Sequence, residues 1–141
     1  MAAYFDASAL LPATVREPSS AAIDQLIRRL ERPLFVSEFA ASEVASGVSR
    51  LVRTRELLID KAVEALADFD AWRTLATEAI ELREADIRLE HTFVRRFELM
   101  LRTSDALHLA ICRRTESTLV TLDHRMGSAA NALGIPVEPL V

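Results

Sequence analysis

The sequence is poor in the residue types on which several common classes of site depend. Its 141 residues include one cysteine, Cys112, so an internal disulfide is excluded and a reducing, cytoplasmic compartment is expected. The three glycines, Gly47, Gly127 and Gly134, are too scattered for a glycine-rich loop that binds phosphates or dinucleotides. The chain is therefore neither a disulfide scaffold nor a protein with one of the common nucleotide-binding loops.

Long apolar runs are also missing. No stretch approaches the ~20 apolar residues that a membrane-spanning helix needs. No Lys or Arg precedes Asp6, as one would in a signal peptide, so we expect no membrane association. The length suits one hydrophobic core, and we assign residues 1–141 to a single domain.

The charge balance argues against bulk binding to nucleic acid. The formal net charge is -4, which disfavours a protein that coats a polyanion by electrostatics alone. Every basic residue except Lys61 is an arginine, whose planar side chain suits paired contacts with phosphate. The base composition of the source genome explains the same bias, so arginine content decides nothing about function.

Short apolar strands alternate with helical segments along the chain. Strands are expected at residues 3–5, 34–36 and 118–122, with an edge strand at 135–137. Apolar residues at helical spacing predict helices within residues 23–30, 40–51, 58–69 and 80–101, from residue 105, and up to residue 133. Strands separated by helices pair in parallel, so the pattern predicts an α/β sandwich with a small parallel sheet.

Four carboxylates in apolar surroundings are the most informative feature of the sequence. Asp6 and Asp123 follow predicted strands, whereas Glu43 and Asp105 fall in the first turns of predicted helices. Ligands of parallel sheets bind beyond the carboxyl ends of the strands. We therefore expect all four acids at one end of the sheet.

Four acids gathered at one place indicate a metal site. Two unit charges ~5 Å apart repel by about 3 kcal/mol at an effective dielectric constant of ~20. A cluster would thus cost much of a domain's stability of ~5–15 kcal/mol unless a divalent cation compensated it. Oxygen-only ligands favour Mg²⁺ or Mn²⁺, and His91, His108 and His124 lack the spacing of zinc ligands. Such an ion can activate a water that hydrolyses a phosphodiester.

Each acid also has a purely structural explanation. Asp6 can cap a helix after the first strand, and Asp123 can be a turn residue. Asp105 can stabilise a helix N-terminus through the macrodipole. Glu43 can be a surface acid, with Glu38 as a rival for the ligand role.

Polar neighbours of the acids suggest supporting roles. His108 lies three residues after Asp105 on the same helical face, and we expect it in the core or behind the ligands rather than among them. Ser8 and Thr121 can hydrogen-bond a ligand carboxylate, and local backbone capping explains them nearly as well.

Several segments, in order, resemble the PIN-domain ribonucleases, specifically the VapC-type toxins of bacterial toxin–antitoxin pairs. They are YFDASAL at residues 4–10, residues 37–46 around Glu43, RTSDALHLA at 102–110, TLD at 121–123 and LGIPV at 133–137. The DALHLA run is the most specific of them. The resemblance covers essentially the whole chain, although residues 53–101 carry no matching motif.

The resemblance implies a fold, an activity and partners. The fold would be a PIN-like three-layer α/β/α sandwich with a small, mainly parallel sheet and a helical insertion. The activity would be that of an Mg²⁺- or Mn²⁺-dependent endoribonuclease, with Asp6, Glu43, Asp105 and Asp123 around the metal. A homodimer and a small antitoxin protein that blocks the site are also implied.

Our leading hypothesis is therefore a metal-dependent endoribonuclease, the toxin of a toxin–antitoxin pair, with RNA as substrate. Arg102 and Arg125, next to candidate ligands in the sequence, are candidates for phosphate contacts. Two alternatives stay open at this point: a non-catalytic binding module that keeps the PIN fold, and a metal-dependent nuclease that acts on DNA.

Overall fold

The computed structural model describes residues 1–140, and four short strands form one sheet at its centre. The strands are β1 (Ala3–Phe5), β2 (Leu34–Ser37), β3 (Glu78–Ile80) and β4 (Thr118–Val120). Their order is β3-β2-β1-β4, and all three pairings are parallel. The predicted parallel sheet is thus confirmed, and β1 lies between β2 and β4.

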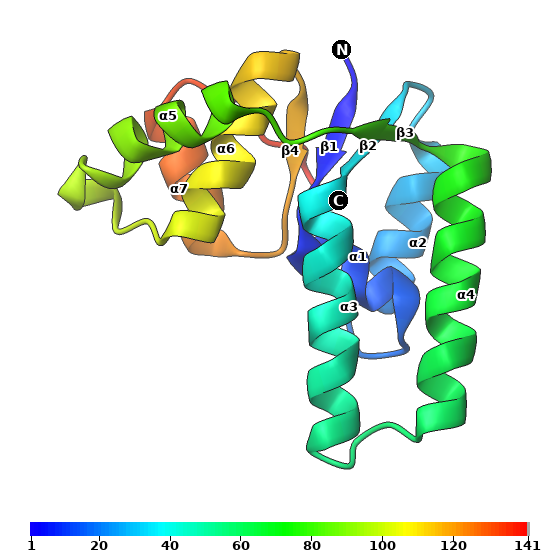
Figure 1. The fold of residues 1–141 in the computed structure, drawn as a ribbon. Helices are drawn as coiled ribbons and strands as arrows, with labels where there is room; N and C mark the ends of the chain where they lie inside the picture. Colours follow the sequence, from blue (N-terminus) through cyan, green and yellow to red (C-terminus); the bar gives the residue numbers. More distant parts are fainter. Residues whose placement is uncertain (141) are drawn as a thin grey trace.

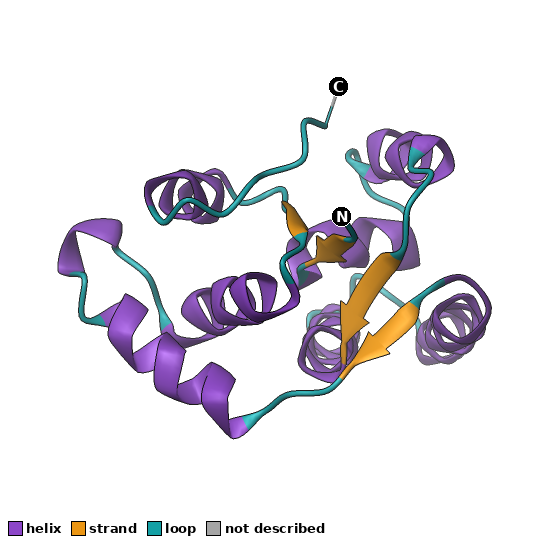
Figure 2. Ribbon diagram, turned by 90° about the horizontal axis from the view of Figure 1, so that it is seen from above, coloured by secondary structure: helices purple, strands orange, loops and turns teal. Residues whose placement is uncertain are grey.

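Helices cover both faces of this sheet, which makes three layers (Figures 1 and 2). The helices are α1 (Ala7–Thr14), α2 (Ser20–Arg29), α3 (Glu38–Arg53), α4 (Ile59–Ala76), α5 (Glu84–Val94), α6 (Thr103–Thr115) and α7 (His124–Ala132), with a 3-10 turn, η1 (Phe97–Leu99). None of the helices within residues 1–140 is both long and apolar enough to cross a bilayer.

The strand residues divide between two hydrophobic cores by simple alternation. Ala3 and Phe5 of β1 pack with apolar residues of α1, α2, α3 and α4, whereas Tyr4 packs with α5, α6 and α7. β4 behaves in the same way, with Val120 in the first core and Leu119 in the second. Successive side chains of a strand point to opposite faces, so strands buried on both sides appear as continuous apolar runs in the sequence.

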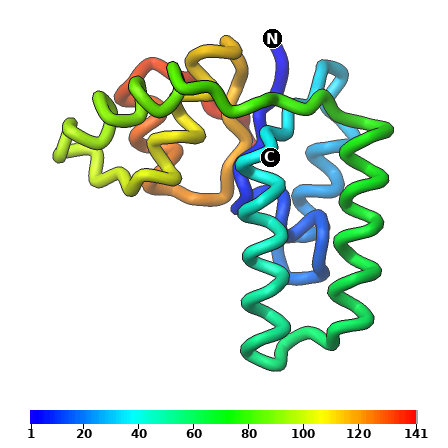
Figure 3. Tube along the Cα trace, in the orientation of Figure 1, coloured from blue at the N-terminus to red at the C-terminus, as the bar shows by residue number. Residues whose placement is uncertain are grey.

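The helical hairpin α3–α4 extends well beyond the end of the sheet. The two helices run side by side in opposite directions (Figure 3). Helix α4 continues to Ala76, seven residues past the predicted range of 58–69. This hairpin is the helical element that projects from the sandwich.

Two predictions about the strands were wrong. Residues 78–80 form the strand β3, which was not predicted. Its last residue, Ile80, is the first residue of the stretch 80–101 that was expected to be mostly helical. Glu78 and Ala79 are exposed, so this edge strand lacks the buried apolar run that marks the others. Residues 135–137 do not form a strand, since only an isolated bridge joins Val137 to Leu119. Pro136 has no N–H to donate and limits the pairing there.

A buried ion pair fastens α5 to α6. The Asp86 carboxylate accepts hydrogen bonds from Arg114 Nε at 2.6 Å and from Arg114 Nη2 at 3.0 Å. It also caps α5 by accepting from the backbone N–H of Arg83 at 2.9 Å. The Asp86 side chain is 1% exposed, so removal of its cationic partner would leave a buried charge without compensation.

We therefore expect Arg114→Met to lower the free energy of unfolding by about 3–5 kcal/mol, measured by urea denaturation. Arg88→Met is the matched control, because Arg88 pairs with Glu84 at 3.3 Å on the exposed surface. That substitution should change stability by no more than about 0.5 kcal/mol. Equal losses of unfolding free energy in the two variants would show that the buried pair contributes no more to stability than the exposed pair does.

Candidate active site

The four candidate acids lie on elements that meet beyond the carboxyl ends of β1 and β4. Asp6 directly follows β1 and is the N-cap of α1, while Asp123 follows β4 and is the N-cap of α7. Asp105 is the third residue of α6, as expected for a first turn. Glu43 lies in the second turn of α3 rather than the first, because that helix already begins at Glu38.

Asp6 is buried and bonded to hydroxyl groups rather than to a cation. Its Oδ1 accepts from Ser8 Oγ at 2.8 Å and from the Ala9 N–H at 3.1 Å. Its Oδ2 accepts from Thr121 Oγ1 at 2.7 Å. The hydroxyls of Ser8 and Thr121 thus bind this carboxylate, as one of the two sequence interpretations proposed.

The same two hydroxyls join the loop after β1 to the loop after β4. Ser8 Oγ and Thr121 Oγ1 are 3.1 Å apart. Ser8 Oγ accepts from the Leu122 N–H at 2.9 Å, and Thr121 Oγ1 accepts from the Asp123 N–H at 3.0 Å. Thr121 therefore contacts both Asp6 and the backbone of Asp123, which places these two acids in one network.

Burial raises the pKa of the Asp6 carboxyl above its ordinary value. Only 1% of the residue is exposed, and loss of hydration disfavours the charged form. The hydrogen bonds from Thr121 and Ser8, with a weaker electrostatic contribution from His108, oppose this shift in pKa without cancelling it. The protein therefore compensates the charged form of Asp6 only in part.

Asp123 and Asp105 each use one carboxylate oxygen to cap a helix. Asp123 Oδ1 accepts from the backbone N–H groups of Arg125 at 2.9 Å and Met126 at 3.2 Å. Asp105 Oδ2 accepts from the Arg102 N–H at 3.2 Å, and Arg102 Nε lies 3.7 Å away. Asp105 thus lies at a helix N-terminus, as its structural explanation required, and Asp123, which was explained as a turn residue, is the N-cap of α7. In each case the other oxygen has no hydrogen-bond donor within residues 1–140.

Glu43 is bonded to His108 on the neighbouring helix α6. His108 Nε2 contacts Glu43 Oε1, and His108 Nδ1 lies 2.6 Å from Tyr4 Oη. Tyr4 Oη in turn lies 2.9 Å from Ser37 Oγ, the residue that caps α3. His108 is buried, so the expectation that it lies in the core is confirmed. Burial also raises the pKa of Tyr4 well above its ordinary value, which keeps the phenol protonated.

Glu38, the rival to Glu43, points elsewhere. Its Oε1 accepts from Arg73 Nη2 at 3.0 Å, and its side chain is 62% exposed. This surface ion pair joins α3 to α4. Glu43 is therefore the acid of α3 that belongs with the site.

Hydrogen bonds connect the elements that carry the acids in two separate groups and do not enclose the acids in one cage. Asp6 and Asp123 share the network around Thr121, while Asp105 and His108 lie on α6 and His108 holds Glu43. Over the described part of the chain, no three His, Cys, Asp or Glu side chains gather closely enough to hold an ion. A joint role of the four acids as metal ligands thus stays a prediction.

The chemistry of the donor set nevertheless fits a hard divalent cation. Glu43, Asp105 and Asp123 each engage one oxygen with the protein and keep the other without a donor from residues 1–140. Carboxylate ligands of Mg²⁺ and Mn²⁺ are commonly held by such hydrogen bonds at their second oxygen. Among the four candidate acids within residues 1–140, a guanidinium group approaches Asp105 alone, at 3.7 Å, and that arginine side chain is largely exposed.

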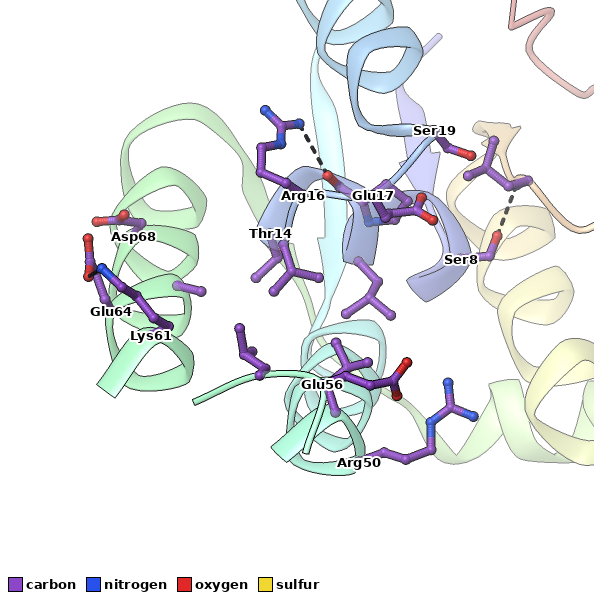
Figure 4. Close-up of a pocket in the computed structure, with 17 residues that line it drawn as sticks. Ser8, Thr14, Arg16, Glu17, Ser19, Arg50, Glu56, Lys61, Glu64 and Asp68 are labelled. Atoms are coloured by element: carbon purple, nitrogen blue, oxygen red, sulfur yellow. Dashed lines mark hydrogen bonds and ion pairs between the residues drawn. The ribbon is translucent and has the colours of Figure 1, made fainter. Parts of the chain in front are cut away.

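A cavity of about 820 Å³ opens on the Ser8 side of the site (Figure 4). It lies between α1, the loop after α3 and the start of α4, and Ser8 and Leu122 form its end nearest Asp6. The charged residues that line it are Arg16, Glu17, Arg50, Glu56, Lys61, Glu64 and Asp68. Acidic residues outnumber basic ones there, so the cavity is not a cationic groove for phosphates.

Sequence reasoning missed Tyr4 as a polar member of the site. A tyrosine within the apolar run of a buried strand is indistinguishable from a core aromatic. The useful signal would have been that a buried phenol needs a hydrogen-bond partner, and that Ser37 follows the adjacent strand. Asp86 was missed for a different reason, because its charged helix gives no sign of burial.

Asp6→Asn should leave the stability of the metal-free protein unchanged or raise it at neutral pH. The raised pKa means that the folded state binds the Asp6 proton more tightly than the unfolded state does. Stability from this group is therefore lost as pH rises from the unfolded pKa through the folded pKa. The gain in unfolding free energy of Asp6→Asn over wild type should grow across that window, in urea denaturation with EDTA. Asp70→Asn, at an exposed position on α4, should show no such trend.

Comparison of the sequence with known proteins identifies one family over most of the chain. The model of the PIN domain matches residues 3–132. Ribonuclease VapC46 of Mycobacterium tuberculosis (strain ATCC 25618 / H37Rv) is 33% identical over 139 residues, which are 96% of this chain and 95% of the relative.

Solved structures of low sequence identity share the fold. A VapC20 structure from Mycobacterium tuberculosis, described as a Sarcin-Ricin loop cleaving toxin, has a TM-score of 0.71 at 15% identity and covers 90% of this chain and 94% of its own. DNA-bound VapBC from Salmonella typhimurium has a TM-score of 0.73 at 12% identity over 100% of this chain and 99% of its own. The family match and the curated relative confirm the resemblance found in the sequence: this chain belongs to the PIN-domain family.

Proposed function

We propose that this protein is a metal-dependent endoribonuclease, the toxin of a toxin–antitoxin pair, that works in the cytoplasm. One observation carries the proposal. Glu43, Asp105 and Asp123 each keep one oxygen without a donor from residues 1–140, and the buried Asp6 accepts hydrogen bonds but forms no ion pair there. The curated relative, which bears the name ribonuclease, supports RNA as the substrate.

Asp6, Glu43, Asp105 and Asp123 would hold the ion. Bound Mg²⁺ or Mn²⁺ would supply charge stabilisation at the phosphate and a more acidic water. Ser8 and Thr121 donate hydrogen bonds to Asp6, and His108 contacts Glu43. The backbone N–H groups at the start of α7 orient Asp123.

Arg102 and Arg125 flank the acids and are suited to contact RNA phosphates. The Arg102 side chain is 80% exposed, and Arg125 is exposed in the first turn of α7. Arg102 is the N-cap of α6, three residues before Asp105. Arg125 lies two residues after Asp123, the N-cap of α7. Arginine can bind a phosphate through two parallel hydrogen bonds, which would align the backbone of a bound strand.

The test is cleavage of single-stranded RNA by purified protein with Mn²⁺. Asp6→Asn should reduce the cleavage rate by about 100-fold or more, because loss of metal-based charge stabilisation costs several kcal/mol. EDTA should abolish cleavage by the wild type. The matched control, Asp70→Asn on the exposed surface of α4, should cleave at the wild-type rate.

The outcomes separate the proposal from its alternatives. Equal cleavage by wild type and Asp6→Asn would overturn the assignment of the site. Failure of the wild type to cleave any strand, together with no thermal stabilisation by Mn²⁺, would indicate a non-catalytic binding module. Cleavage of DNA oligonucleotides in the same panel, with RNA left intact, would indicate a DNA nuclease.

We also propose an antitoxin protein and a second copy of this chain as partners. The similar solved structures include VapBC complexes and a Klebsiella pneumoniae toxin-antitoxin complex, which supports a protein inhibitor here. A short reading frame beside the gene for this chain should encode a protein that co-purifies with it and suppresses RNA cleavage. Light scattering of the chain alone should give twice the mass of one chain. A monomer that the neighbouring product neither binds nor inhibits would contradict this part of the proposal.

A further inference from the structure

We propose that His108 is a positioning residue, which aligns Glu43 for a divalent cation through a hydrogen-bond chain that begins at the N-terminus of α3. The proposal rests on the proposed function, since it gives Glu43 the role of a ligand. It assigns to His108, Tyr4 and Ser37 a task that their burial in the core does not by itself require.

The chain of hydrogen bonds crosses three elements. The Ala40 N–H donates to Ser37 Oγ at 2.9 Å, and Ser37 Oγ lies 2.9 Å from Tyr4 Oη. Tyr4 Oη lies 2.6 Å from His108 Nδ1, and His108 Nε2 contacts Glu43 Oε1. Both ends of the chain are on α3, so the path leaves that helix, passes through β1 and α6, and returns to it.

The donors and acceptors fit in one direction along this path. Ser37 Oγ accepts from the backbone, which leaves its hydrogen for Tyr4 Oη. The Tyr4 phenol is protonated and can donate to His108 Nδ1. The hydrogen on Nε2 then faces the Glu43 carboxylate. Every hydrogen in the chain has an acceptor, and the ring nitrogen that faces Glu43 is the one that donates.

Packing holds the imidazole in this orientation. The ring centroid of His108 lies 5.1 Å from that of Phe39 and 5.8 Å from that of Tyr4. The His108 side chain is only 3% exposed, so the ring has no room to turn away. Glu43 differs, because its side chain is 31% exposed and would otherwise sample several rotamers. The fixed partner therefore restricts the mobile one.

Such an arrangement is what a metal ligand needs. One carboxylate oxygen of Glu43 is held by the imidazole, and the other has no donor within residues 1–140. Groups that orient a ligand in this way typically change metal affinity by about 10–100-fold when they are removed. A histidine that served packing alone would change stability and leave the affinity for metal unaltered.

Titration with Mn²⁺, followed by calorimetry and by thermal stabilisation, tests the proposal without any measurement of activity. His108→Leu should weaken Mn²⁺ binding by about 10–100-fold. His108→Gln, whose amide N–H can still reach Glu43, should recover most of that loss. Tyr4→Phe keeps the imidazole but removes its anchor, and we expect a smaller loss of affinity.

Ser117→Ala is the matched control. Ser117 is buried and bonds to Thr115 at 2.9 Å at the far end of α6 from Asp105. Its loss should cost stability while the affinity for Mn²⁺ stays at the wild-type value. The hydrogen bond itself can be observed without metal, because Glu43→Gln should shift the nuclear magnetic resonance of the His108 Nε2 hydrogen.

The outcomes distinguish this proposal from the proposed function. Wild-type affinity, or tighter binding, in His108→Leu would overturn the role of His108 and leave the nuclease proposal intact. If His108→Leu does not fold, unaltered affinity in Tyr4→Phe together with an unshifted His108 resonance in Glu43→Gln would overturn it. Absence of Mn²⁺ binding by the wild type would instead refute the metal site as a whole.

Discussion

The rest of the site depends on the burial of the Asp6 carboxylate at the end of the central strand β1. The sheet order places β4 beside β1, so Thr121 can reach Asp6 from a position more than a hundred residues later in the chain. Two hydroxyl groups and the Ala9 N–H donate hydrogen bonds to the carboxylate but supply no opposite charge. Burial consequently keeps its pKa raised, and a cation is the natural complement of such a group.

A carboxylate has two oxygens, so a side chain that caps a helix with one oxygen can still offer the other to a metal ion. In Asp105 and Asp123 one oxygen closes a helix N-terminus, which fixes the side chain, and the other is left over. Glu43 reaches a similar state through a side chain, since His108 takes the place of the backbone donor. The structural explanations of these acids therefore do not exclude the proposed role as ligands, because each side chain keeps one oxygen without a donor from residues 1–140.

The buried pair of Asp86 and Arg114 shows a different solution to the same physical problem. There a guanidinium pairs with the carboxylate through two hydrogen bonds, and the pair joins α5 to the C-terminal part of α6. The contrast between a neutralised Asp86 and an unneutralised Asp6, both 1% exposed, is an argument for function at Asp6.

The sequence by itself determined the parallel sheet, both buried flanking strands and the order of the motifs, because apolar runs and helical spacing are local properties of the chain. It also placed Asp6, Asp105 and Asp123 correctly beside strand ends and helix starts. Only the tertiary structure decided that Glu43 contacts His108 whereas Glu38 pairs with Arg73, that Tyr4 contacts the other nitrogen of His108, and that residues 78–80 complete the sheet. These features depend on which side chains meet across elements distant in the chain, and hydrophobic periodicity carries no information about such partners.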